Sequence, residues 1–116
     1  MTLQEFSEKT EMDLRGTLER FANMEPMLVK FLKKFAEDPS FQELSQAVAD
    51  KDYPMMERSA HTLKGVAGNL GFQSLFHINQ EIVDAVRAGD YSKIDDCFAR
   101  DKEVYDNIIK CLTMLD

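Results

Sequence analysis

Four residues of chemical interest lie within a short stretch of this 116-residue chain: His61, Lys64, Gly65 and Gly68. A neutral imidazole is a nucleophile near neutral pH, and its nitrogen can form a covalent intermediate. Attack on a phosphoryl group gives phosphohistidine, and a nearby lysine ammonium offsets the charge of that group. Glycines leave space through which another molecule can approach the ring. The combination indicates phosphoryl transfer through His61.

These residues are predicted to lie on one helix. Apolar residues recur there at steps of three and four, the spacing of a buried helical seam: Tyr53, Met56, Ala60, Leu63, Ala67 and Leu70. His61 lies roughly 130° from this seam, on the solvent face. Gly65 and Gly68 follow at i+4 and i+7, with Lys64 on the flank of the same face. Each glycine costs about 1 kcal/mol relative to alanine inside a helix, so a pair beside an exposed histidine favours a functional reason.

The rest of the chain also has helical periodicity, and no segment shows the alternation of a strand. Asp52 is the expected cap of the histidine helix, Gly71 its end, and Asp38-Pro39 a break in an apolar stripe. The expected segments are a short helix capped by Thr2, a second from Asp13 to near Asn23, one broken or two separate helices over 26–50, the histidine helix over 53–70, a helix from about Leu75 to Gly89, and a last helix from about Tyr91 to Leu115.

Short connections between long amphipathic helices favour antiparallel neighbours. The predicted fold is therefore all-α, an antiparallel up-and-down four-helix bundle with short additional N-terminal helices. The length fits a single domain over residues 1–116, with peripheral helices over 1–24 and the bundle over 25–116. Because these helices can close a bundle within one chain, a monomer is expected.

The charge balance excludes several classes of function. With 14 Lys and Arg residues against 21 Asp and Glu residues, the formal charge is −7, which disfavours nucleic acids and anionic membrane surfaces as partners. No apolar run approaches the roughly 20 residues of a membrane span, and the first residues lack the basic region of a signal peptide. A cytoplasmic location is expected.

Motifs for other chemistry are not found. The sequence has no Gly-rich nucleotide loop and no Ser/His/Asp set, and Cys97 and Cys111 are predicted to be buried core residues. No metal and no cofactor are expected. The chain is predicted to be a stoichiometric phosphocarrier rather than an enzyme with its own ATP site, so its phosphoryl donor and acceptor are other proteins.

Residues 60–65, Ala-His-Thr-Leu-Lys-Gly, and the downstream glycines resemble the H-x-L-K-G signature of histidine-containing phosphotransfer (HPt) domains. The likeness extends from about residue 25 to Gly89 and includes the order of the helices. It implies a four-helix bundle in which His61 is phosphorylated, Lys64 is the basic residue beside it, and Gly65 is kept small for receiver access. The implied partners are response-regulator receiver domains, which hold Mg²⁺ on their own side, and a hybrid sensor histidine kinase.

One position of the family pattern stays open. Some members place an amide from the next helix near the histidine. Asn79 and Gln80 are the candidates for it here, and Val83 stands at one position where an amide is expected.

The assignments of Gly68 and Arg58 also have alternatives. Gly68 is assigned to partner binding, with tight helix packing as the alternative. Arg58 is assigned to a partner's acidic pocket, with an ordinary solvated charge as the alternative.

Two other functions compete with phosphotransfer. One is a bundle that binds receiver domains without carrying phosphate. The other is the dimerisation and phosphoacceptor region of a sensor kinase. Such a region would have an acidic residue directly after the histidine to act as a base, and this chain has Thr62 there.

Overall fold

The computed structural model describes residues 1–116 and is helical throughout, which confirms the all-α prediction. One isolated β-bridge joins Met12 to Phe72. The helices are α1 (Leu3–Thr10), α2 (Leu14–Arg20), α3 (Glu25–Phe35), α4 (Ser40–Asp50), α5 (Tyr53–Leu70), α6 (Gln73–Ala88), the 3-10 helix η1 (Tyr91–Lys93) and α7 (Ile94–Leu112).

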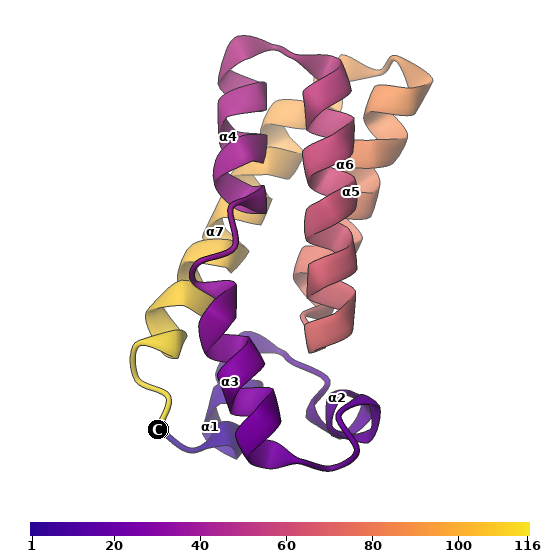
Figure 1. The fold of residues 1–116 in the computed structure, drawn as a ribbon. Coiled ribbons are helices and arrows are strands. Elements are labelled where there is room, and N and C mark those ends of the chain that lie inside the picture. Colours follow the sequence, from indigo (N-terminus) through magenta and orange to yellow (C-terminus); the bar gives the residue numbers. More distant parts are fainter.

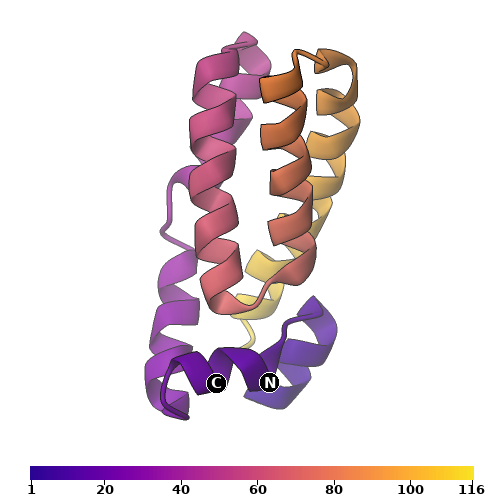
Figure 2. The same cartoon turned by 90° about the vertical axis from the view of Figure 1, so that its right-hand side faces the viewer.

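Helices α4, α5, α6 and α7 form an up-and-down bundle, as predicted (Figure 1). Helix α3 extends beyond the lower end of α4, and α1 and α2 lie at that same end. After a quarter turn, α5 and α6 stand side by side in front, and α2 crosses beneath them (Figure 2). No helix is both long enough and apolar enough to cross a membrane.

Capping residues set the ends of the helices that carry the candidate site. The side chain of Asp52 accepts a hydrogen bond from the Met55 backbone N–H at 3.2 Å, so α5 begins where predicted. Gly71, with φ of 78°, ends α5 in the left-handed conformation that glycine adopts without strain. The Asp38 carboxylate accepts from the Ser40 N–H at 2.8 Å. Residues 26–50 therefore fold as two helices.

Two predicted boundaries differ from the structure. Helix α2 ends at Arg20 rather than near Asn23, because Ala22 and Asn23 have φ of 54° and 59° and leave the helical region. The last helix begins with a short 3-10 turn over Tyr91–Lys93, and its α-helical part ends at Leu112.

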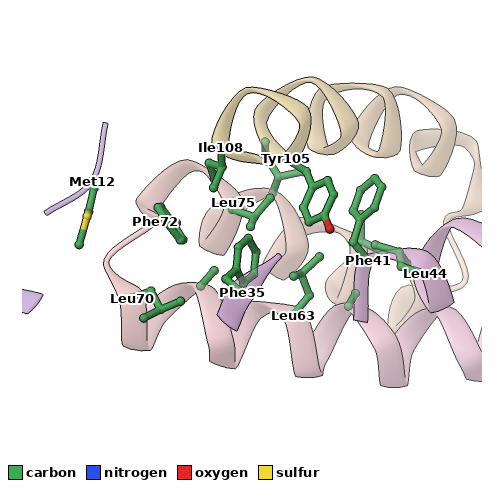
Figure 3. Close-up of a cluster of buried hydrophobic side chains, with 14 of the residues drawn as sticks. Met12, Phe35, Phe41, Leu44, Leu63, Leu70, Phe72, Leu75, Tyr105 and Ile108 are labelled. Atoms are coloured by element: carbon green, nitrogen blue, oxygen red, sulfur yellow. The ribbon is translucent and has the colours of Figure 1, made fainter. Parts of the chain in front are cut away.

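The hydrophobic core lies between the bundle helices and reaches α3 (Figure 3). Tyr105 of α7 stacks on Phe41 of α4, with ring centroids 3.9 Å apart. Phe35 of α3 lies 5.8 Å from the Tyr105 ring and 5.4 Å from the Phe72 ring. Leu63 of α5 is fully buried in the same core, which turns the neighbouring His61 outward.

One polar pair lies inside this core. The apolar stripe of α7 is interrupted at Asp101, and the structure buries Asp101 completely, together with Asn79 of α6. The Asn79 side-chain nitrogen donates to Asp101 Oδ1 at 2.8 Å and to the Leu75 carbonyl at 2.8 Å. The interruption therefore faces a neighbouring helix rather than solvent.

The N-terminal helices α1 and α2 pack against one end of the bundle. Phe6 of α1 is fully buried, and its ring meets Phe72 edge-on at 6.2 Å. The Arg20 guanidinium of α2 donates to the carbonyls of Gly68 and Asn69 at 3.1 and 3.3 Å. These carbonyls belong to the last turn of α5, where helical N–H donors run out, and the Gly68 carbonyl accepts one long backbone bond, from the Gly71 N–H at 3.4 Å. Arg20 thus caps the helix that carries His61.

Candidate functional site

Helix α5 presents His61 to solvent, as its apolar seam predicts. Ala60 and Leu63 are fully buried, while His61 and Thr62 are exposed. The Thr62 hydroxyl donates to the Arg58 carbonyl one turn earlier at 3.0 Å. The imidazole therefore stands on a regular helix that is packed against the core on its other side.

His61 lines a shallow hollow of about 250 Å³ formed by one end of α5 and one residue of α6. Its other lining residues are Pro54, Glu57, Arg58, Thr62 and Arg87. Arg87 of α6 donates to a Glu57 carboxylate oxygen across the two helices at 2.5 Å. The hollow thus holds the imidazole, a threonine hydroxyl and two guanidinium groups, one of which is already paired with a carboxylate.

Arg87 was not selected by the analysis of the sequence. It lies thirty residues from Glu57 along the chain. The sequence does contain a signal for this pairing. Helices α5 and α6 are antiparallel and joined by a short turn, so residues equally far from the turn along the two helices, such as Glu57 and Arg87, lie side by side. Using that signal requires the register between α5 and α6, which helical periodicity alone does not define.

Lys64 is turned toward α6 and does not line the hollow with His61. Its ammonium donates to Gln80 Oε1 at 2.6 Å and lies 5.6 Å from the centre of the Phe76 ring. The Gln80 side-chain nitrogen in turn donates to Asp84 Oδ1 at 2.8 Å. A hydrogen-bonded chain therefore runs from Lys64 through Gln80 to Asp84.

The two glycines of the predicted open strip have different surroundings. No atom lies within 4 Å of the position that a Cβ would take at Gly65. At Gly68, a Cβ would lie 3.1 Å from the ring of Phe76. Gly65 therefore leaves open space one turn after His61, whereas the structure shows helix packing at Gly68, the alternative considered for that residue.

The two candidate amides of α6 face different neighbouring helices. Asn79 points into the core and binds Asp101, and Gln80 binds Lys64. Val83 is fully buried. The amide of Gln80 thus reaches the lysine of the site, and neither amide hydrogen-bonds His61.

This arrangement suits a nucleophilic imidazole that receives a compact anion. The ring is exposed, the space beside Gly65 lets a protein surface approach, and Arg58 and Arg87 supply positive charge at the hollow. Positive groups around a transferring phosphoryl group stabilise its charge, which is the main task in phosphoryl transfer.

Comparisons with known proteins give one match. Neither the search of curated proteins nor the search of solved structures finds a relative. The family model described as "Hpt domain" matches residues 26–115, which include α3 to α7, His61 and the whole hollow around it. With most of its length matched and its helices arranged as the signature implies, the chain belongs to the Hpt domain family.

Proposed function

We propose that the chain is a histidine phosphotransfer protein of a two-component phosphorelay. It accepts a phosphoryl group on His61 from a receiver-domain aspartate and passes the group to the aspartate of another receiver. Membership of the Hpt domain family supports phosphotransfer as the general role. The observation that carries the assignment to His61 is its exposure beside the open space at Gly65.

The transfer step uses the lone pair of one imidazole nitrogen. This nitrogen attacks the phosphorus of the aspartyl phosphate, the nitrogen–phosphorus bond forms, and the phosphorus–oxygen bond to the aspartate breaks. The receiver aspartate leaves as a carboxylate, and the second ring nitrogen keeps its proton. The return step to another receiver is the reverse of this exchange. Each step moves one phosphoryl group, so the chain acts as a stoichiometric carrier.

The groups around His61 have distinct parts in this step. Arg58 and Arg87 lie at the hollow and can meet the phosphoryl oxygens or the acidic pocket of a receiver. Gly65 keeps open the approach of the receiver's loops. Lys64 supplies a further cation from the flank of the same helix face.

The direct experiment follows a labelled phosphoryl group from a phosphorylated receiver domain. Wild-type protein should gain acid-labile label, and His61→Gln should gain none. His77→Gln is the matched control, because His77 is the other histidine and is also exposed; it should accept label at the wild-type rate. Label that persists in His61→Gln, or disappears in His77→Gln, would contradict the assignment.

We also propose that residues 1–116 fold as one unit that acts as a monomer in the cytoplasm. The buried Phe6 supports the joining of residues 1–24 to the bundle over 25–116. The hydrogen bond from the Asn107 side chain to the Lys9 carbonyl at 3.0 Å supports it as well. Light scattering tests the oligomeric state, and a stable dimer would favour the sensor-kinase phosphoacceptor alternative.

A further inference from the structure

The side chain of Gln80 is held at both ends of its amide. Its Oε1 accepts from the Lys64 ammonium at 2.6 Å, and its Nε2 donates to Asp84 Oδ1 at 2.8 Å. A reversed amide would place its NH₂ group against an ammonium and its oxygen against a carboxylate, and neither contact forms a hydrogen bond. Asp84 therefore orients Gln80 so that its oxygen faces Lys64.

The partners of Lys64 hold its ammonium against α6. Phe76, Gln80 and Asp84 follow one another at four-residue steps and so lie along one face of α6. The lysine is half-buried against this face, with its ammonium near the Phe76 ring. The hollow beside His61 is lined by Arg58 and Arg87 instead. In this state the ammonium of Lys64 is bound to Gln80 of α6 and does not line the hollow beside His61.

A phosphoryl group on His61 would compete with Gln80 for the lysine. It carries close to two negative charges near neutral pH and has three acceptor oxygens, whereas the Gln80 oxygen belongs to a neutral amide. The bond from the Lys64 ammonium to Gln80 has one charged partner, whereas a bond from it to a phosphoryl oxygen would have two, whose opposite charges also attract each other. Lys64 lies at i+3 from His61, within reach on one helix face.

We propose that Gln80, oriented by Asp84, is a positioning residue that holds Lys64 on α6 until His61 is phosphorylated. Lys64 then exchanges the Gln80 oxygen for a phosphoryl oxygen. This inference rests on the proposed function in that it assumes a phosphoryl group on His61. The Gln80 oxygen then competes with the phosphoryl group for Lys64 and thereby limits how long His61 retains the phosphoryl group.

The test uses phosphoramidate as the phosphoryl donor, so that no receiver domain is needed. The imidazole attacks the phosphorus, the nitrogen–phosphorus bond of the reagent breaks, and ammonia leaves. The measured quantity is the half-life of phosphorylated His61 against hydrolysis. Gln80→Leu removes the competing acceptor and should lengthen the half-life about fivefold, the equivalent of one hydrogen bond. Gln80→Glu binds Lys64 more tightly and should shorten it below the wild-type value.

The chain offers a matched control on α4. Gln46 donates to Asp50 at 3.0 Å with the same four-residue spacing as Gln80 and Asp84, and the hydrogen bonds of the structure give it no lysine partner. Gln46→Leu should leave the half-life unchanged. In a Lys64→Ala background, Gln80→Leu should have no further effect, because the cation for which the two acceptors compete is gone.

Side-chain NMR gives a second readout that does not depend on hydrolysis. The amide NH₂ signals of Gln80 should shift when wild-type protein is phosphorylated and should shift much less in Lys64→Ala. Equal half-lives for Gln80→Leu and wild type, or a Gln80→Leu effect that survives in Lys64→Ala, would overturn the inference. Failure of a receiver domain to label His61, with these phosphoramidate results as expected, would overturn the proposed function alone.

Discussion

Two neighbouring amides on α6 face different helices of the bundle. Asn79 is fully buried between α6 and α7, where it binds Asp101, and Gln80 is half-buried between α6 and α5, where it binds Lys64. Asn79 belongs to the core and Gln80 to the candidate site. The side of the helix on which each residue lies, rather than the chemistry of its side chain, therefore determines whether it meets the core or the candidate site.

The core side of α6 faces a buried carboxyl group, that of Asp101 on α7. Burial raises the pKa of Asp101 to about 7, and the hydrogen bond from Asn79 and the nearby Arg100 guanidinium only partly oppose this rise. Asp101 Oδ2 and Asn79 Oδ1 are both buried without a hydrogen-bond partner. On the site side, every polar atom of the Gln80 amide group has a charged partner. The core side should therefore respond to pH through stability.

The largest expected effect is the pH dependence of that stability. Well below about pH 4, Asp101 is protonated in both the folded and the unfolded chain. As the pH rises to about 7, the unfolded chain loses this proton while the folded chain keeps it. The free energy of unfolding should therefore fall by up to roughly 4 kcal/mol over this range. Chemical denaturation at several pH values measures this fall.

Asp101→Asn tests whether Asp101 is its source, because this variant cannot ionise and should remove most of the decrease. Asp95→Asn, at an exposed position of the same helix, should keep it. An unchanged pH profile in Asp101→Asn would show that the carboxyl is not the responsible group.

The second effect separates the two amides directly. Asn79→Ala leaves buried Asp101 without its hydrogen-bond donor and should cost roughly 2–3 kcal/mol of stability at pH 7. Gln80→Ala acts near the surface and should change stability by less than about 0.5 kcal/mol. Denaturant midpoints of the two variants make the comparison, and equal losses would break the distinction between the two sides of α6.

Replacing each of the two glycines of α5 by alanine should change the stability by different amounts, and the difference should be about the helix propensity that separates alanine from glycine. Gly65→Ala fills open space and should stabilise the protein by about 1 kcal/mol. At Gly68, the new methyl would lie 3.1 Å from the Phe76 ring, so the ring must move and the gain should be lost. Thermal unfolding of the two variants measures the difference.

Gly65→Gln should keep the added stability and block transfer from a receiver, because the larger side chain fills the open space. Transfer at the wild-type rate would exclude Gly65 from the docking surface.

A small effect on stability is also expected at the surface ion pairs. Arg87 pairs with Glu57 on the site side of α6, and Arg100 pairs with Glu81 on the α7 side. Each exposed pair contributes at most about 1 kcal/mol. Arg87→Ala should slow phosphotransfer to His61 about threefold to tenfold through the loss of a charged contact, and Arg100→Ala should not slow it. Rapid-quench kinetics with one receiver domain provide the rates.

Features that depend on one helix at a time could be predicted from the sequence. The apolar seam through Ala60 and Leu63 placed His61 on the solvent face, and Asp52 and Gly71 marked the ends of its helix. The open space at Gly65 followed from its spacing from His61. Each of these inferences needs only the period of an α-helix and its capping rules.

Features that depend on two helices were not predictable in the same way. The ring over Gly68 comes from Phe76, the partner of Lys64 is Gln80, and the partner of Asp101 is Asn79. Each requires the register and rotation of one helix against another, which periodicity does not supply. For this reason Asn79 and Gln80 could not be distinguished from the sequence, although Asn79 faces α7 and Gln80 faces α5.

The open surroundings of Gly65 also affect the motion of α5. Backbone groups at this point lack the cover that a side chain gives, and glycine weakens a helix interior. Local opening should therefore be easier around Gly65 than elsewhere in the interior of α5, and the Gly65 amide hydrogen should exchange with deuterium faster than that of buried Ala60. A protein that docks over Gly65 would cover this weak point, so slowed exchange in one turn of α5 would map its footprint.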